Sequence, residues 1–557
     1  MELTEKDPSG AGRRRQKTYK YRLILEGALI GLITGALISV FRLMLTGADT
    51  IRDCMVEFAG SGAGHALIIA LILIAVAAVI TVLLVIEPDI TGSGIPQVEG
   101  ELRGQKDMNW RRVIAAKMAG CALAIGGGLA LGREGPSIQI GAMVGKGFAR
   151  ARRTPLTEER LLLTCGAGAG LSAAFGAPLA GAIFSLEELH RNFSAEVLLT
   201  TMAAAAASDF VTANILGLTP VFGFEVEHGL PLKYYWAVIF LGLILGVFGA
   251  VYNRTIDFMQ NISEKAGKAF ADLVCGIAGK TPALIKDGLH PTIFAARAAA
   301  FGRVLCMMAL AYVMYFVYPE VLGSGSGLVG QISHGEYALG AIALLLLVKF
   351  IFSTASFGSG SPGGIFLPLL VLGALTGGLF SRLLGLAGVD QTYITGFVVV
   401  AMAGYFAAIV RAPVTGVVLI TEMTGDFTTL LPLVLTALVA YLTAEALGVK
   451  PIYTQLLERS MGRPSASRSA LLRDRKTVID TEVHIGSRMD GGHVADFGLP
   501  LGTLIVSVTR GGIEIIPDGN TILRGGDELE ILTRENDIAD VESIVDEACH
   551  VVEAGSR

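Results

Sequence analysis

The segment Leu131–Gly141, LGREGPSIQIG, is the one around which the chain is organised, because it places a carboxylate, Glu134, at the start of an otherwise uncharged apolar segment. Gly132, Gly135 and Pro136 predict a break in the backbone and a new helix start, since proline lacks the N–H that a first helical turn leaves unused. A helix N-terminus carries free N–H groups and partial positive charge, which attract a carboxylate or a mobile anion. The stretch therefore predicts a place for which Glu134 and an anion compete; the alternative is that Glu134 only caps its own helix.

The composition around this stretch is that of a polytopic membrane protein. Of the 557 residues, 52% are hydrophobic and only 17% charged, and the mean hydropathy is +0.60. Several uncharged runs are long enough to span a bilayer: Ala66–Ile86, Tyr234–Tyr252, Phe350–Ser381, Gln391–Val410 and Phe427–Ala444. The 70 glycines are scattered through apolar runs, which favours close helix packing and interrupted helices.

Charge and composition divide the chain into four parts. A basic segment, residues 1–22, carries Arg13, Arg14, Arg15, Lys17, Lys20 and Arg22 just before the first apolar run. By the positive-inside rule this segment lies in the cytoplasm, so the cluster needs no nucleic-acid partner. We expect a membrane domain over 23–457, a polar linker over 458–475 and a small cytoplasmic α+β domain over 476–557.

An internal repeat organises the membrane domain. Ala177–Glu187 matches Ala412–Glu422, with Ala-Pro, Gly and Glu at the same offsets. A second match aligns Pro136 and Gly141 with Pro368 and Gly373, which places Glu134 opposite Phe366. Repeats joined across a membrane commonly hold the substrate at their interface, where broken helices point their ends at it. We expect such breaks at Gly92–Pro96, Gly132–Pro136, Gly358–Pro368 and Arg411–Pro413.

Two of these breaks offer neutral ligands for an anion. GSGIP, at Gly92–Pro96, presents a serine hydroxyl between two glycines, and GSGSPGGIFLP, at Gly358–Pro368, presents the amides of Ile365 and Phe366 at a helix start. Alone, either stretch is more typical of a loop or of packing. Together they provide dipoles that bind an anion weakly enough for it to leave, as transport requires.

The stretches GSGIP, GREGP and GGIFLP, in this order, resemble the signatures of the CLC family of chloride channels and chloride/proton antiporters. The resemblance covers about 23–457. It implies an all-α polytopic fold with two inverted halves, broken helices around an anion path in each subunit, and a homodimer in the inner membrane. It requires no cofactor.

The resemblance also implies roles for individual residues. Ser93 and Tyr453, the latter in KPIYTQLL, are expected to be hydroxyl ligands of the central anion, and Ile365 and Phe366 to contribute backbone N–H groups. Glu134 is expected to be the external gate and Glu188, in FSLEEL, the internal proton-transfer residue. A serine at position 93 favours chloride over nitrate. Gln97 stands where a glutamate is frequent, which leaves the charge of the inner vestibule open.

These residues predict proton-coupled chloride exchange, and the runner-up is a passive chloride channel. A remote alternative is a metal-dependent membrane enzyme, since Glu187 and His190 form an ExxH pair. A dinuclear carboxylate site needs a second such pair and further glutamates, which the membrane part does not offer. Gly323–Gly327, GSGSG, lacks the Lys-Ser/Thr of a phosphate-binding loop.

The tail from about Lys476 to Val551 resembles the RCK C-terminal (TrkA-C-like) domain of potassium-transport regulators. Strands are expected at Leu504–Thr509, Ile513–Ile516 and Glu528–Leu532, and a helix at Ile538–Ala548. The resemblance implies dimerisation and a regulatory ligand, with cyclic di-AMP or another nucleotide as the candidate. A dimerising domain without any ligand is the equal alternative.

Overall fold

A computed structural model describes residues 8–190, 195–217, 222, 229–278, 291–460, 476–484, 486–500, 502–510, 513–534, 541, 544–545 and 548–549. The chain divides into two compact units, Met1–Leu457 and Glu458–Arg557. The regular elements in the described part of the first unit are all helices, and the second unit contains a small sheet.

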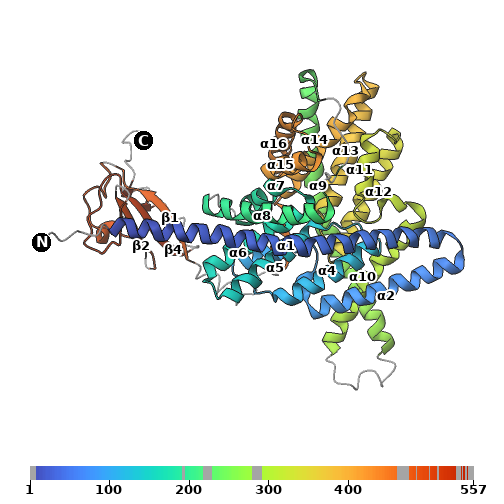
Figure 1. The fold of residues 1–557 in the computed structure, drawn as a ribbon, viewed down its shortest axis with the longest axis horizontal. Coiled ribbons are helices and arrows are strands. Elements are labelled where there is room, and N and C mark those ends of the chain that lie inside the picture. The colour runs from blue at the N-terminus through green and yellow to red at the C-terminus, as the bar shows by residue number, and fades with distance from the viewer. Residues whose placement is uncertain are drawn as a thin grey trace. The chain divides into compact units, whose positions relative to one another are not determined.

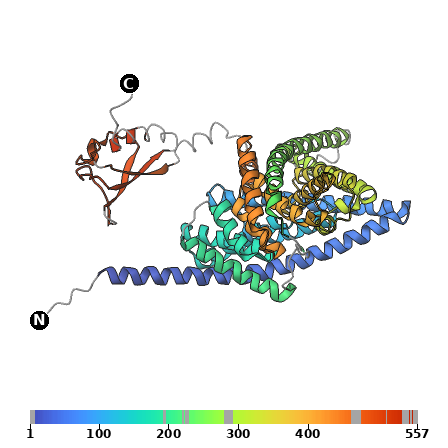
Figure 2. The ribbon, with the colours of Figure 1, turned by 90° about the horizontal axis from the view of Figure 1, so that it is seen from above.

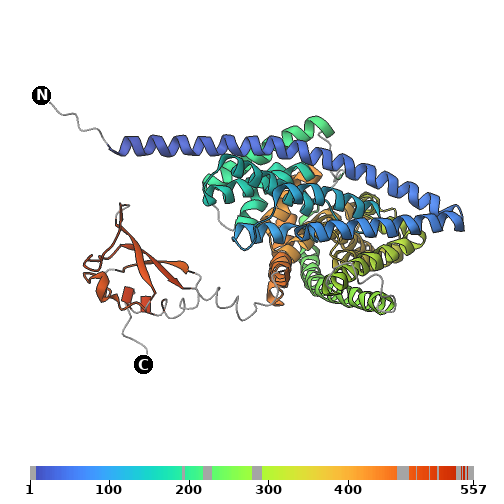
Figure 3. The same ribbon diagram turned by 90° about the horizontal axis from the view of Figure 1, so that it is seen from below.

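The first half of the helical unit opens on a long helix that begins within the basic N-terminal segment (Figure 1). Its helices are α1 (Pro8–Gly60), α2 (Ala63–Ile86), α3 (Ile95–Leu102), α4 (Trp110–Gly126), α5 (Glu134–Arg152), α6 (Leu156–Phe175), α7 (Pro178–Phe184) and α8 (Ala195–Leu216). The short turns η1 (Pro88–Ile90) and η2 (Ser185–His190) precede α3 and follow α7. Figures 1 and 3 show α1 and α2 meeting at one end as a hairpin.

The second half repeats the alternation of long and short helices. Its helices are α9 (Tyr235–Ala278), α10 (Pro291–Val317), α11 (Ser326–Ser333), α12 (Leu339–Gly358), α13 (Phe366–Leu386), α14 (Ile394–Val410), α15 (Pro413–Thr424), α16 (Leu430–Ala446) and α17 (Ile452–Ser460). The short turns are η3 (Leu232–Tyr234), η4 (Pro319–Val321) and η5 (Gln391–Tyr393). All four predicted breaks are confirmed, because helices begin at Ile95, Glu134, Phe366 and Pro413.

Eight helices in the described part of the chain are long and apolar enough to cross a membrane. The uncharged run Phe350–Ser381 is not one of them, because it contains the end of α12, the loop 359–365 and most of α13. The run Phe427–Ala444 corresponds to the shorter apolar helix α16. Counting uncharged residues therefore predicted one membrane span where glycine and proline divide the first run between two helices, and it predicted a full span where the second run forms the shorter helix α16.

Glycines set the distance between the packed helices. On α1, a side chain at Gly27 would meet the Thr200 carbonyl oxygen of α8 at 2.7 Å, and side chains at Gly31 and Gly35 would lie even closer to the carbonyl oxygens of Ala204 and Ser208. Gly141 and Gly166 give α5 and α6 the same close approach. Glycine allows helix backbones to touch in a membrane, where hydrophobic burial does not drive association. This packing holds α5, and with it Glu134, against the rest of the helical unit.

The C-terminal unit contains a four-stranded sheet with the order β1-β4-β2-β3, all antiparallel. Figure 2 shows these strands as red and orange arrows. Its strands are β1 (Lys476–Glu482), β2 (Leu504–Arg510), β3 (Ile513–Ile515) and β4 (Glu528–Arg534), and a short turn, η6 (Val494–Phe497), precedes β2. Three of the strands were predicted, and β1 was missed because it follows the polar linker without a turn signal. Val541, Val545 and Ala548, from the expected closing helix, are buried in the core of this unit.

The expected linker falls mostly outside the described residues. Helix α17 runs to Ser460, so the first residues of the predicted 458–475 linker are helical. Residues 461–475 are not described, and neither are Gly511 and Gly512, between two of the expected strands, or much of the predicted helix 538–548.

Candidate functional site

The two halves of the repeat meet through their glycine loops. Gly132, before α5, and Gly364, before α13, form a reciprocal backbone bridge, with N···O distances of 2.6 and 2.7 Å. Gly92 joins the same arrangement, because its carbonyl accepts a bond from the Gly363 N–H at 3.0 Å. The three signature loops therefore converge, and the starts of α5 and α13 face one another across the bridge.

Glu134 lies at this junction. Its side chain is fully buried, and the Leu367 N–H in the first turn of α13 donates to its Oε2 at 3.4 Å. The Arg133 guanidinium lies 3.9 Å from Oε1. The carboxylate thus contacts the N-terminus of a helix from the other half of the repeat, where unpaired N–H groups and the helix dipole favour negative charge. The structure places this carboxylate where an anion would be stabilised.

Two buried hydroxyl groups belong to the same region. Ser93 abuts Gly135, since a side chain at Gly135 would meet the Ser93 carbonyl oxygen at 2.7 Å. Tyr453 lies in the first turn of α17, and Leu457, one turn further along this helix, lies against Gly100 of α3, the helix that follows Ser93. Within the described residues neither Ser93 Oγ nor Tyr453 Oη has a hydrogen-bond partner, although both are buried. Buried polar groups without a partner indicate an ion or water that satisfies them.

The amides expected from Ile365 and Phe366 lie where α13 begins, with Ile365 at the N-cap position. The amide that contacts Glu134 is that of Leu367, one residue further on, which the signature did not single out. The Phe366 ring packs against Phe175 and Phe406, with centroids 5.3 and 4.6 Å apart. These contacts hold the start of α13 in place from both halves of the unit.

Glu188 lies on η2, a π-helical turn that continues α7, and only 4% of it is exposed. Single π-helical turns are frequent at functional sites. Helix α3, which begins two residues after Ser93, contacts η2. The side chain of Gln97 on α3 donates to the Thr91 carbonyl at 2.8 Å, so it supports the loop that carries Ser93.

Glu187 and Glu422, the repeated glutamates, cap each other's helices. Glu422 accepts from the amides of Leu179 and Ala180 at the start of α7, at 3.0 and 2.8 Å. Glu187 accepts from the amides of Val414 and Thr415 at the start of α15, at 3.2 and 2.8 Å. The carboxylate of the ExxH pair is therefore engaged by helix amides, which disfavours the metal-site interpretation. The described residues contain no group of three metal-ligating side chains.

Two buried lysines support the loops, and the sequence interpretation missed them. Lys117 on α4 donates to the carbonyls of Ile90 and Gly92, at 2.9 and 2.7 Å. Lys349 on α12 donates to the carbonyls of Val321 and Gly323, at 2.7 and 3.0 Å. The two lysines have the same separation along the chain as Gly132 and Gly364, so the repeat itself was the signal that could have identified them.

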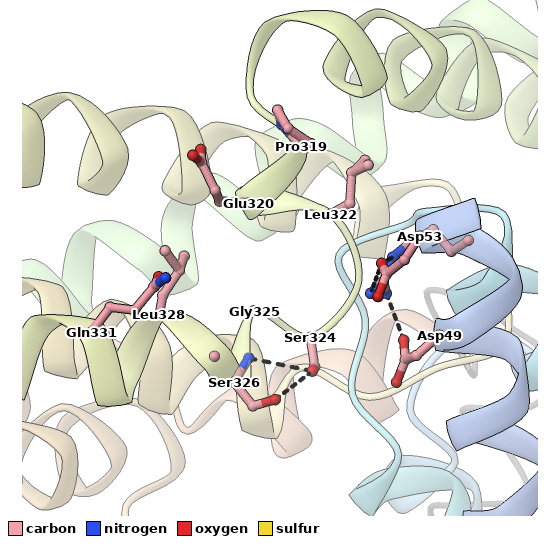
Figure 4. Close-up of a pocket in the computed structure, with 12 residues that line it drawn as sticks. Asp49, Asp53, Pro319, Glu320, Leu322, Ser324, Gly325, Ser326, Leu328 and Gln331 are labelled. Carbon is pink, nitrogen blue, oxygen red and sulfur yellow. Dashed lines mark hydrogen bonds and ion pairs between the residues drawn. The ribbon is translucent and has the colours of Figure 1, made fainter. Parts of the chain in front are cut away.

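The second of these loops, Gly323–Gly327, is thus the repeat counterpart of Gly92–Pro96. Its residues Ser324–Gly327 line a pocket of about 290 Å³ at the N-terminus of α11 (Figure 4). Asp49, Asp53 and Glu320 line the same pocket, where Arg52 binds Asp49 at 2.5 Å and Asp53 at 2.9 Å. Because three carboxylates outnumber the one guanidinium, this pocket does not suit a phosphate.

Fold and site together define a class of protein: a membrane transporter with two repeats, whose broken helices converge on a buried carboxylate and buried hydroxyl groups. The sequence matches the family model described as "Voltage gated chloride channel" over residues 74–445 and the TrkA-C domain over residues 479–546. The chain belongs to the voltage-gated chloride channel (CLC) family and is a multi-pass membrane transport protein, not an enzyme, with a C-terminal TrkA-C domain.

Known relatives and structures are similar over most of the chain. The H(+)/Cl(−) exchange transporter ClcA of Vibrio vulnificus (strain YJ016) is 32% identical over 448 residues, covering 79% of this chain and 90% of the relative. The protein of that name in Vibrio cholerae (strain M66-2) is 36% identical over 379 residues, covering 67% and 75%. The structure of a slow cyanobacterial Cl−/H+ antiporter is 28% identical with a TM-score of 0.69, covering 79% of this chain and 98% of that one.

Proposed function

We propose that this protein exchanges chloride for protons across the membrane. The observation that carries the proposal is the position of Glu134, buried at the N-terminus of α13 in the neighbourhood of the unpartnered hydroxyls of Ser93 and Tyr453. The names of the relatives, which are exchange transporters, support the same function.

The chemistry follows from competition for one place. A deprotonated Glu134 holds the N-terminus of α13 and excludes an anion, and protonation removes the charge that the helix dipole favours. Chloride then takes hydrogen bonds from Ser93, Tyr453 and the amides of Ile365 and Phe366. Because proton binding at Glu134 makes room for chloride, the movements of the two ions are coupled.

Glu188 is proposed as the proton donor and acceptor on the other side of the site. A buried carboxyl group in a membrane protein is costly unless it is used or paired. The contact between η2 and α3, the helix that begins two residues after Ser93, supports a proton route that reaches the anion site from η2.

The test is to replace Glu134 with Gln in liposomes while chloride and pH are recorded together. We expect chloride movement to continue and proton movement against its gradient to stop. Glu336→Gln, an exposed carboxylate on a loop, is the matched control and should exchange like the native protein. A Glu134→Gln variant that still pumps protons when driven by chloride would contradict the gate assignment. A native protein that moves no protons uphill would instead be a passive channel.

For the second unit we propose a regulatory role in a homodimer of the inner membrane, with both termini in the cytoplasm. The match to a TrkA-C domain and the separate core of this unit support the proposal. A ligand such as cyclic di-AMP can regulate transport only if it binds one dimer arrangement better than another. Calorimetry with a nucleotide panel, paired with flux through the full-length protein and a protein ending at Lys476, tests it. Absence of binding and identical flux would leave the domain as a dimer clamp.

A further inference from the structure

Two further tyrosines carry buried hydroxyl groups close to the central site. Tyr252 on α9 and Tyr405 on α14 are both fully buried, and their Oη atoms have no hydrogen-bond partner within the described residues. Neither lies in a signature loop. Leaving a phenol hydroxyl dry and unpaired costs free energy that phenylalanine at the same position would avoid. Two such groups in one region therefore call for a functional reason.

The two tyrosines form one cluster with Tyr453. The rings of Tyr252 and Tyr405 meet edge to face, with centroids 6.0 Å apart. Asn253, next to Tyr252, donates to the Lys450 carbonyl at 3.1 Å, and Gln455 on α17 donates to the Asn253 carbonyl at 3.1 Å, so Tyr252 lies where α9 meets the first turn of α17, which carries Tyr453. Phe350 packs edge to face against Tyr252, and Phe248 packs against Tyr405, so aromatic rings from α9 and α12 enclose the cluster. The cluster thus joins the first turn of α17 to the interface between α9 and α14.

We propose that Tyr252 and Tyr405 are positioning residues for the anion site, acting through Tyr453 by way of bound water. This inference rests on the proposed role of Tyr453 as an anion ligand. A phenol can donate one hydrogen bond and accept others, so Tyr453 can donate to chloride while water from the cluster donates to its oxygen. Hydrogen bonds in such a chain polarise one another, and the bond to the anion is strengthened.

The test is equilibrium chloride binding to the purified protein by calorimetry, with potassium chloride as the titrant. Tyr252→Phe and Tyr405→Phe each remove one hydroxyl and keep the ring, so the fold is preserved. We expect each to weaken chloride binding about fivefold, the effect of losing one hydrogen bond. Tyr315→Phe is the matched control: its hydroxyl is also buried and without a partner in the described residues, but its ring lies beside Gly128, where a side chain would meet it at 2.9 Å, near Leu322 of the pocket at the N-terminus of α11.

The double variant Tyr252→Phe/Tyr453→Phe separates positioning from general damage. If Tyr252 acts through Tyr453, the double variant binds chloride no more weakly than Tyr453→Phe alone. If the double variant instead loses chloride affinity by the product of the two single-variant factors, the inference is wrong. It is also wrong if Tyr252→Phe and Tyr405→Phe both bind chloride like the native protein while Ser93→Ala and Tyr453→Phe bind it weakly. If Ser93→Ala and Tyr453→Phe also bind like the native protein, the proposed anion site itself fails and this inference fails with it. A crystal structure in bromide should show water at the Tyr252 hydroxyl, and a bromide ion there would contradict the water bridge.

Discussion

The reciprocal capping of α7 and α15 predicts an unequal response to two equivalent substitutions, Glu187→Ala and Glu422→Ala. Glu187 accepts one hydrogen bond at an exposed position, from the Val414 amide, and Glu422 accepts one from the Leu179 amide. Water can replace both of these bonds. At partly buried positions Glu422 keeps one bond, to the Ala180 amide. Glu187 keeps two there, to the amide and the hydroxyl of Thr415 at 2.8 and 2.7 Å.

A hydrogen bond to a charged group contributes about 1.5–3 kcal/mol, and water replaces the exposed bonds at little cost. We therefore expect Glu422→Ala to cost about 2 kcal/mol and Glu187→Ala about 4 kcal/mol of the free energy of unfolding. The measurement is thermal unfolding of the purified protein in detergent, followed by fluorescence. Glu336→Ala, whose carboxylate is exposed, should unfold like the native protein.

The order of the thermal unfolding midpoints tests whether the two carboxylates cap these helices. Glu187→Ala should unfold first, then Glu422→Ala, then the control. If both variants unfold with the control, or if Glu422→Ala is the less stable of the two, the carboxylates do not cap these helices as described.

Three further outcomes are expected. Ser93→Pro should raise nitrate flux relative to chloride in liposomes, and an unchanged anion ranking would remove Ser93 from the site. Gly135→Ala should cost about 1–3 kcal/mol through overpacking against Ser93 and weaken chloride binding, whereas Gly47→Ala, which meets nothing within 4 Å, should change neither property. In the C-terminal unit, partial burial raises the pKa of Asp527, but the bonds from Arg510 at 2.8 and 2.6 Å lower it below its ordinary value. The stability that this ion pair contributes is therefore present above the ordinary carboxyl pKa and is lost as the pH falls through the lower folded value. In the native full-length protein, we expect the C-terminal unit to become more sensitive to protease as the pH falls, and Asp527→Asn should remove this pH dependence. An unchanged dependence would show that the Asp527–Arg510 ion pair does not stabilise the unit.

The sequence was informative wherever the signal is local. Glycine and proline at Gly92–Pro96, Gly132–Pro136, Gly358–Pro368 and Arg411–Pro413 gave correct helix breaks, because backbone geometry depends on the residue itself. The repeat and the signature stretches gave the family and the fold.

Contacts between distant residues depend on how the helices pack and could not be predicted from the sequence. Glu187 and Glu422 were recognised as equivalent, but that each caps the other's helix depends on how the halves pack. The contact of Glu134 with the Leu367 amide likewise joins atoms more than two hundred positions apart in the chain. No local pattern carries such a contact, because it depends on the relative placement of two helices.

Buried polar side chains show the same limit. Lys117 and Lys349 lie in apolar runs and look like isolated charges in the sequence, yet each is satisfied by two loop carbonyls. Tyr252 and Tyr405 look like packing residues until the structure shows their hydroxyls enclosed without partners. Whether a polar group is paired depends on its surroundings in three dimensions, and that information exists only once the helices have been assembled.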